Sequence, residues 1–180
     1  PPFALCERPE PFVLPPTNDM DVFTNDLGFI AVVEHGELLG YNVTVGGGMG
    51  RSHGNVTTYP RLASELGFIP REKLLAVARA VLTIHRDFGD RANRKHARLK
   101  YIVEERGVDW TRAELEQRLG FTLAPLRPYR FTTTGDLYGW HRAVDGSQFL
   151  TIFVETGRIK DVPGRTLKAA LRAVAEQFPR

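Results

Sequence analysis

Two stretches with the hydrophobic pattern of β-strands lie close together in the first quarter of the chain. Residues 27–34 and 38–45 are rich in β-branched and aromatic side chains, and His35-Gly36-Glu37 between them has the composition of a turn. This pattern predicts a β-hairpin. The glycine-rich stretch 46–55 follows the second strand directly, and we expect it to form a loop.

Helical spacing of hydrophobic positions begins further along the chain. Pro70 suits the first turn of a helix and Gly89 suits its end. One face of this predicted helix carries Leu74, Val77, Ala78, Val81, Leu82 and His85.

Two further helices are predicted after this one. Residues 94–106 are strongly basic in their first turns, and Gly107 ends the segment. Thr111 and Glu114 have the spacing of a capping box, which predicts the start of a third helix that ends at Gly120.

The last part of the chain has a different pattern. The proline-containing segment 125–129 is typical of a boundary, and residues 139–144 and 148–155 flank Asp145-Gly146, a strong hairpin signal. An amphipathic helix follows over 166–178, with its predicted inward face formed by Leu167, Ala170, Leu171, Val174 and Phe178. Two strands and a helix are half of a ferredoxin-like unit, so we expect a partner half to cover its apolar face.

Composition limits the classes of protein that the chain can belong to. No stretch approaches the roughly 20 apolar residues that span a bilayer, so we expect a cytoplasmic protein without a membrane partner. Cys6 is the only cysteine, and it cannot hold an iron–sulfur cluster alone. The net charge of +3, carried mostly by arginine, is compatible with nucleic acid or with a polyanionic small ligand.

Common catalytic and nucleotide-binding motifs are absent from the sequence. The glycines at 46–50 do not fit the dinucleotide fingerprint, since Arg51 stands where its third glycine is needed, and no Gly-Lys-Ser/Thr follows for a P-loop. The five histidines lack the close spacing of a metal site, and no serine lies in a G-x-S-x-G elbow.

A glycine patch and a basic segment remain as candidates for binding. Consecutive glycines allow a large flat ligand to approach the backbone closely, and clustered arginines can neutralise several carboxylates. A tight turn followed by a solvated basic helix explains the same pattern without any ligand. The basic side chains concerned are Arg91, Arg94, Lys95, Arg98 and Lys100.

Several motifs in order resemble the siroheme-dependent sulfite and nitrite reductase hemoproteins. The stretch Asn18-Asp19-Met20-Asp21-Val22-Phe23 is similar to the start of a reductase repeat, and Gly46-Gly47-Gly48-Met49-Gly50-Arg51 is similar to the glycine loop of this family. The resemblance covers about Pro15 to Phe178. Its other parts lie at residues 59–63, 86–91, 94–101 and 139–161.

This resemblance implies a fold and an activity. The implied fold is α+β: a Pro-rich lead over 1–14, a reductase-repeat lobe with a mixed sheet and helices over 15–127, and a ferredoxin-like β-β-α half-domain over 128–180. The family reduces sulfite to sulfide, or nitrite to ammonia, by six electrons with siroheme and a 4Fe-4S cluster. Its members need the remaining segments of the reductase and take electrons from ferredoxin or a flavoprotein.

The resemblance also implies which residues contact the siroheme. The glycine loop of the family lies against the macrocycle, and the basic segment meets its carboxylates. Asn25, Arg51, His53 and Asn55 are expected to shape the loop. The residues expected to bind the cofactor are Gly46, Gly47, Gly48, Met49, Arg91, Arg94, Lys95 and Arg98.

Two departures from the family pattern lead us to expect an inactive chain. Residues 3–14 contain no lysine where the family has anion-binding lysines, and the cluster cysteines would follow Arg180. We therefore expect a fragment, a split gene product or one lobe, with no catalytic residue or metal ligand of its own and neither cofactor retained in isolation.

A non-catalytic basic binding module, for nucleic acid or another anion, is the alternative. It would use exposed sheet aromatics for base stacking. We expect core packing to account for these aromatics, so nucleic acid is not the expected partner. They are Phe29, Tyr41, Phe149 and Phe153.

Overall fold

The computed structural model describes residues 11–143 and 145–178, which form two compact units. The first unit ends at Gly135 and the second begins at Asp136. The predicted domain limits at 14/15 and 127/128 stay a prediction. No helix among the described residues is long and apolar enough to cross a lipid bilayer.

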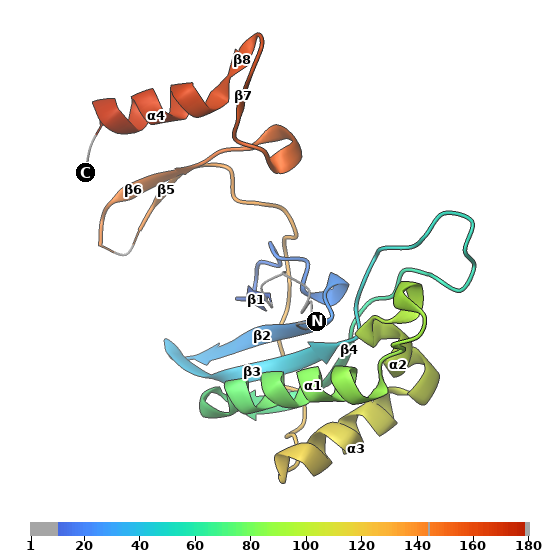
Figure 1. The fold of residues 1–180 in the computed structure, drawn as a ribbon. Helices are drawn as coiled ribbons and strands as arrows, with labels where there is room; N and C mark the ends of the chain where they lie inside the picture. The colour runs from blue at the N-terminus through green and yellow to red at the C-terminus, as the bar shows by residue number, and fades with distance from the viewer. Residues whose placement is uncertain (1–10, 144, 179–180) are drawn as a thin grey trace. The chain divides into compact units, whose positions relative to one another are not determined.

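The first unit is built on a mixed four-stranded sheet in the order β1-β2-β3-β4 (Figure 1). Strand β1 (Phe12–Val13) is parallel to β2 (Leu27–Glu34), whereas β3 (Glu37–Val45) is antiparallel to both of its neighbours. The predicted hairpin is confirmed, with Phe29 opposite Val43. Strand β4 (Ser64–Pro70) was not predicted, because Gly67 interrupts the short apolar run within it.

Helices cover one face of this sheet (Figure 1). A 3₁₀ turn, Arg71–Lys73, leads from β4 into α1 (Leu74–Phe88), which buries Val77, Ala80, Val81 and Ile84. The predicted start at Pro70 is therefore wrong by four residues, because Pro70 is still the last residue of β4. The first unit also contains the 3₁₀ turns Val22–Thr24 and Arg94–His96 and the helices α2 (Leu99–Arg106) and α3 (Val108–Leu119).

The predicted continuous helix over 94–106 is wrong. Arg98 has an extended backbone, φ −75° and ψ 152°, which separates the 3₁₀ turn from α2. The predicted cap of the third helix is also wrong: α3 begins at Val108, and the Thr111 hydroxyl donates to the Gly107 carbonyl, 2.8 Å away. The break at Arg98 involves contacts with Asp26 and Gly47, which are distant in sequence, whereas α3 begins directly after Gly107, whose φ of 89° ends α2.

One hydrophobic core joins the sheet to the three helices of this unit. Its fully buried members include Phe29, Val43 and Ile69 from the sheet, Val77 from α1 and Leu115 from α3. The segment after α3 then returns across the sheet. There the buried side chain of Asn42 donates to the Arg127 carbonyl (2.8 Å) and accepts from the Arg127 amide (3.0 Å).

The second unit contains the predicted strand, strand and helix in that order. Strands β5 (Gly139–Arg142) and β6 (Gln148–Thr151) form an antiparallel hairpin, and α4 spans Leu167–Gln177. The short strands β7 (Asp161–Val162) and β8 (Arg165–Thr166) precede α4. The α+β fold class is thus confirmed.

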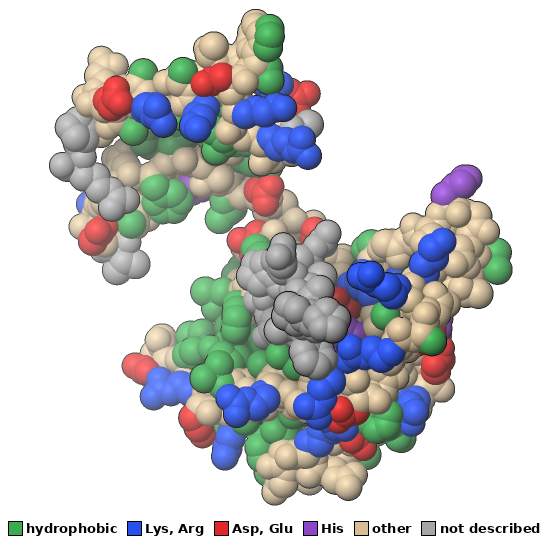
Figure 2. All heavy atoms as spheres, viewed as in Figure 1, with side chains coloured by type: hydrophobic (Ala, Val, Ile, Leu, Met, Phe, Trp, Pro, Cys, Tyr) green, Lys and Arg blue, Asp and Glu red, His purple; other side chains and the backbone are tan. Residues whose placement is uncertain are grey.

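Side chains of the second unit are much more exposed than the amphipathic pattern predicted. No described residue of α4 is buried, and Val174 and Phe178 from its predicted inward face are 56% and 72% exposed. Figure 2 shows hydrophobic side chains at the surface of this unit. The expectation that core packing accounts for Phe149 and Phe153 is wrong here, since they are 51% and 70% exposed, whereas Phe29 is buried as expected. The described part of this unit offers no second layer against which these residues could pack.

Candidate cofactor-contacting loop

The glycine loop leaves the end of β3, and the backbone amides of its first three glycines donate hydrogen bonds within the chain. The amide of Gly46 donates to the Asp26 carbonyl (2.8 Å), that of Gly47 to the Asn25 carbonyl (3.0 Å), and that of Gly48 to the Arg61 carbonyl (2.7 Å). These amides are therefore committed and do not form an open anion-binding nest.

Three of the glycines lie in close contact with the chain itself. Gly46, Gly47 and Gly48 are buried. A Cβ at Gly46 would lie 2.7 Å from the Val103 side chain, and one at Gly48 would lie 2.7 Å from the Arg98 guanidinium. A Cβ at Gly47 would collide with the Phe23 carbonyl. Internal packing therefore requires glycine at positions 46 and 47 even without a ligand, whereas at position 48 the three nearest atoms are the end of the flexible Arg98 side chain, which can move.

The outer part of the loop faces solvent. Met49 is 53% exposed, and a Cβ at Gly50 would meet no atom within 4 Å. Arg51 and His53 are exposed as well. Of the four loop residues predicted to bind the cofactor, Gly46 to Met49, Met49 is the one whose side chain is accessible to a large ligand.

Cationic side chains bind the carbonyls of the glycine run. The Arg61 guanidinium donates to the Gly46 carbonyl (2.9 Å), and the Arg98 guanidinium donates to the Gly47 carbonyl (3.3 Å). The Lys100 ammonium donates to the carbonyls of Gly48 (3.1 Å) and Gly50 (2.8 Å). The structure thus brings the predicted residue Arg98 against the predicted glycine run.

Arg98 is held in place by an ion pair. Its guanidinium lies 2.7 Å from the Asp26 carboxylate, and the two side chains are 39% and 26% exposed. Arg98 Nε and Asp26 Oδ1 are buried and have no hydrogen-bond partner among the described residues. The extended backbone at Arg98 turns this side chain away from the helical path and toward β2 and the loop.

The other predicted basic residues lie on the exposed segment before α2. Arg91 donates to the Arg86 carbonyl (2.9 Å). Arg94 and Lys95 are exposed in the 3₁₀ turn, where the Asn93 side chain caps the Lys95 amide (3.2 Å). No hydrogen bond or ion pair joins the side chains of Arg94 and Lys95 to residues 46–49 within the described chain. The role of Arg91, Arg94 and Lys95 toward a ligand stays a prediction.

Asn25 and Asn55 shape the loop and its approach. The Asn25 amide group donates to the carbonyls of Met20 (3.2 Å) and Asp21 (3.0 Å). The Asn55 side chain accepts from both the amide and the hydroxyl of Thr57, at 3.0 and 2.7 Å. These bonds fold the chain on either side of the glycine run.

Sequence reasoning missed Asp26 and Arg61, and it did not place Lys100 among the cofactor-binding residues. Asp26 is 72 positions from its partner Arg98, and Arg61 is 43 positions from its partner Glu104, 2.8 Å away. No local pattern indicates pairs so far apart. The position of Arg61 directly after Tyr59-Pro60, a motif shared with the reductase family, was the one available signal.

Burial shifts the pKa values of two groups next to the loop, Lys100 and Tyr59. Burial, and next the neighbouring Arg98 guanidinium, lower the pKa of the Lys100 ammonium. Burial, together with the nearby carboxylates of Glu104 and Glu105, raises the pKa of the Tyr59 hydroxyl. The desolvation of Lys100 is offset by hydrogen bonds to carbonyls.

The described residues fit one of the two family cofactors better than the other. Exposed Arg94 and Lys95 have no side-chain partner among the described residues, which suits them to the carboxylates of a tetrapyrrole. An iron–sulfur cluster does not fit these residues. No group of three or more His, Cys, Asp or Glu among them could hold a metal ion, and Cys6 lies outside the described residues.

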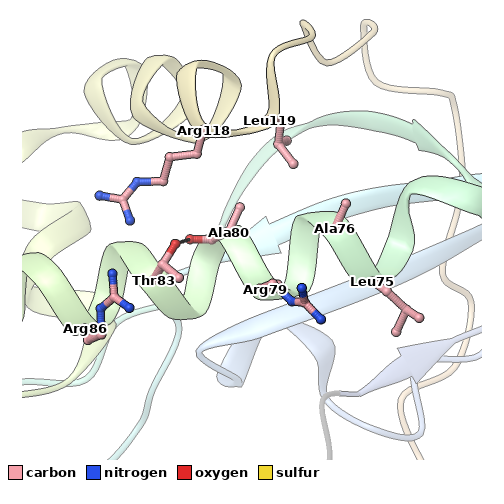
Figure 3. A pocket seen from close by; sticks show the side chains of 8 residues that line it. All are labelled: Leu75, Ala76, Arg79, Ala80, Thr83, Arg86, Arg118 and Leu119. Atoms are coloured by element: carbon pink, nitrogen blue, oxygen red, sulfur yellow. Dashed lines mark hydrogen bonds between the residues drawn. The ribbon is translucent and has the colours of Figure 1, made fainter.

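A separate groove of about 600 Å³ lies between α1 and α3 in the first unit (Figure 3). Its floor is apolar, and arginines line it. Two of them are already paired, since Arg86 lies 2.6 Å and Arg118 lies 2.9 Å from the Asp87 carboxylate. None of the eight predicted site residues lines this groove. The groove is therefore distinct from the glycine loop.

Known proteins with similar sequence and fold were identified. The family described as nitrite and sulphite reductase 4Fe-4S domain matches residues 12–123. The chain is 58% identical over 162 residues to the sulfite reductase (NADPH) hemoprotein beta-component of Myxococcus xanthus, a match that covers 90% of this chain and 29% of the relative. Its counterpart in Anoxybacillus flavithermus is 53% identical over 163 residues, covering 91% of this chain and 28% of the relative.

A solved structure agrees with these matches. The NirA protein of Mycobacterium tuberculosis superimposes with a TM-score of 0.62 and 28% identity, covering 72% of this chain and 23% of that protein. The chain spans less than a third of the length of each of these relatives. Since the matched family segment is more than half of the chain, this chain belongs to the nitrite and sulphite reductase 4Fe-4S domain family.

Proposed function

We propose that this chain is the siroheme-contacting part of a sulfite or nitrite reductase that carries out a six-electron reduction. One observation carries the proposal. The glycine run after β3 and the start of α2 meet through Arg98, which binds both the Gly47 carbonyl and the Asp26 carboxylate. The exposed cations Arg94 and Lys95 precede that contact in the same connecting segment.

In this proposal different residues of the chain contact different parts of the cofactor. Met49 and the exposed outer loop would pack against the macrocycle, and Arg91, Arg94 and Lys95 would bind its carboxylates. Arg98, whose guanidinium donates to the Gly47 carbonyl, would contact the cofactor from the edge of the glycine run. The siroheme iron would supply the site at which the anion binds and accepts electrons.

The proposal includes the dependence of the chain on other parts of a reductase. The described residues offer no ligand set for the 4Fe-4S cluster, so the cluster and its thiolates would come from other segments. Electrons would arrive from ferredoxin or a flavoprotein. We expect the isolated chain to reduce neither sulfite nor nitrite.

Reconstitution tests the proposal. The chain is produced in cells that synthesise siroheme, alone and together with the complementary segments of a sulfite reductase hemoprotein, and siroheme absorbance per mole of purified chain is measured. We expect absorbance only in the combined preparation. Its absence there, with both partners soluble and folded, would contradict the proposal.

A pair of substitutions sharpens the test of the basic residues. Arg94→Ala with Lys95→Ala should lower siroheme loading about tenfold or more, since each lost charge-assisted contact contributes roughly 1.5–3 kcal/mol. The matched control is Arg79→Ala, an exposed arginine of the α1–α3 groove, which should not change loading.

Exposed aromatics on the second unit favour the alternative of a nucleic-acid-binding module. Phe149 and Phe153 are open to solvent near the β5–β6 hairpin. Fluorescence anisotropy with single-stranded RNA at low salt measures nucleic-acid binding directly. Affinity that falls as salt rises would support the alternative, and no detectable binding at low salt would dispose of it.

A further inference from the structure

Lys100 is a fully buried lysine at the second position of α2. Its side chain is 0% exposed, yet no carboxylate lies within ion-pair distance of it among the described residues. A buried charge without such a partner is costly unless its hydrogen bonds are satisfied. The contacts of this ammonium therefore call for an explanation.

Backbone carbonyls satisfy this ammonium completely. The Lys100 Nζ donates to the carbonyls of Gly48, Gly50 and Tyr59, which matches the three donors of an ammonium. The Tyr101 ring adds a cation–π contact, with its centroid 5.0 Å from Nζ. The site is thus a cage of oxygens built around one lysine.

The three carbonyls come from the two arms of one loop. Gly48 and Gly50 lie where the chain leaves β3, and Tyr59 lies where it returns toward β4. The arms also pair directly, because Gly48 and Arg61 exchange backbone hydrogen bonds of 2.7 and 3.0 Å. Lys100 therefore binds the neck of this loop, which we define as residues 48–50 and 59–61. The outer residues of the loop are exposed (cyan in Figure 1).

Other cations at the neck are neutralised by carboxylates. Arg61 pairs with Glu104, and Arg98 pairs with Asp26. Lys100 differs because its partners are neutral carbonyls from both arms. Removing Lys100 would leave the carbonyls of Gly50 and Tyr59 without this donor, and the Gly48 carbonyl with the Arg61 amide alone. Its loss should therefore loosen the neck more than loss of any exposed cation.

We propose that Lys100 is the positioning residue of the glycine loop, which ties the arms at Gly48 and Tyr59 together and so fixes the orientation of Met49. Lys100 itself, being buried, contacts no ligand. Only the statement that this orientation serves a tetrapyrrole rests on the proposed function.

Hydrogen exchange in the isolated chain tests the positioning role without any cofactor. In Lys100→Met, which keeps side-chain length but removes the charge and the donors, the amides of Gly48 and Arg61 should exchange at least about tenfold faster. The amide of Phe29, which donates to the Pro11 carbonyl (3.0 Å), and that of Val43, opposite it in β3, should keep their rates. The matched control is Lys95→Met, an exposed lysine five positions earlier, which should change neither set.

The unaltered chain provides a second measurement in case Lys100→Met does not fold. The chain contains only five lysines, so their ammonium groups can be resolved by ¹⁵N NMR. The Lys100 ammonium should give protons that exchange slowly with water, unlike those of exposed Lys95. A Lys100 ammonium in fast exchange, or unchanged amide rates at Gly48 and Arg61 in a folded Lys100→Met, would overturn the proposal.

Siroheme loading in the reconstituted reductase separates this inference from the proposed function. If both hold, Lys100→Met lowers siroheme retention at least about fivefold, whereas the control Arg79→Ala in the α1–α3 groove does not lower it. If the loop amides are released but the unaltered chain never takes up siroheme, the positioning role stands and the proposed function fails. If the amides are not released, the positioning role fails whatever the loading.

Discussion

The two units of this chain use similar amphipathic patterns with different results. In the first unit, α1 buries Val77, Ala80, Val81 and Ile84 against a four-stranded sheet. In the second unit, α4 has an equally clear apolar stripe, yet none of its described residues is buried. The β5–β6 hairpin of the same unit leaves Trp140 69% exposed. An amphipathic helix therefore needs a second layer as well as a pattern.

This difference indicates where each unit obtains its stability. A two-stranded hairpin with one helix is marginal in water, whereas a covered four-stranded sheet can be stable by itself. We infer that the first unit is the cooperative folding core of the chain. Since Phe149 and Phe153 of the second unit are exposed, we expect a partner surface to bury them.

The largest test compares one phenylalanine from each unit. Phe29→Ala removes a fully buried ring that stacks on Phe12 (5.2 Å between centroids), and it should lower the free energy of unfolding by about 3–5 kcal/mol. Phe153→Ala removes a ring that is 70% exposed and should change it by less than about 0.5 kcal/mol. Urea unfolding of the first unit, followed by circular dichroism, measures both. Equal losses would contradict the comparison.

Glycines with positive φ should give a smaller difference in stability between the two units. Gly107 joins α2 to α3 with φ 89° and ψ 160°, so Gly107→Ala should destabilise the first unit by about 1–3 kcal/mol. Gly164→Ala, at φ 78° between β7 and β8, should strain only the second unit and leave the urea midpoint of the first unit unchanged. A control, Gly135→Ala, lies in open space without positive φ and should be neutral.

Two ion pairs with the same length should differ in strength. Arg98–Asp26 in the first unit and Arg165–Glu155 in the second both have an N–O distance of 2.7 Å. The second pair is more exposed, at 47% and 67%, and water screens it more strongly. We expect a double-mutant cycle on each pair, in which Asp26→Asn or Glu155→Gln removes the carboxylate charge, to give the coupling energy of that pair. This energy should be about 0.5–1 kcal/mol for the first pair and about 0–0.3 kcal/mol for the second. A larger value for the second pair would refute this ranking.

The smallest effect concerns acid titration of one carboxylate in each unit. The Arg86 hydrogen bond, aided by Arg118, lowers the pKa of Asp87 to about 2 from its ordinary 3.8. Because the folded pKa is the lower one, this stabilisation is complete above about pH 4 and is lost as the pH falls toward 2. A ¹³C NMR titration should find this midpoint, and Arg86→Gln should raise it.

The second unit provides the matched titration. Hydrogen bonds from Ser147 lower the pKa of Asp145 in the β5–β6 turn. Ser147→Ala should raise the pKa of Asp145 and leave that of Asp87 unchanged. A change at Asp87 would show that the two titrations are not independent.

Much of the fold was predictable from short-range pattern. The β2–β3 hairpin, the body of α1 and the turn at Asp145-Gly146 follow from alternation, helical period and turn chemistry, which act between near neighbours. Strand β4 was not predictable in the same way. Gly67 interrupts its apolar run, and pairing with β3 holds it in the sheet.

The candidate loop was only partly predictable. The family resemblance located the glycine run and Arg98, and the structure brings them into contact. It did not identify Asp26 or Arg61, and it assigned Lys100 no role in the loop, because their partners lie tens of residues away in sequence. It also attributed the glycines to ligand approach, whereas internal packing accounts for Gly46 and Gly47.

The sequence by itself determined the family of this chain, its α+β class and the residue types around the loop, since these depend on composition, local spacing and ordered motifs. Only the tertiary structure decided that the helix breaks at Arg98, that a buried lysine ties the loop, and that α4 stays uncovered. The reason is physical: burial and ion pairing depend on which distant residues meet, and a local pattern does not contain that information.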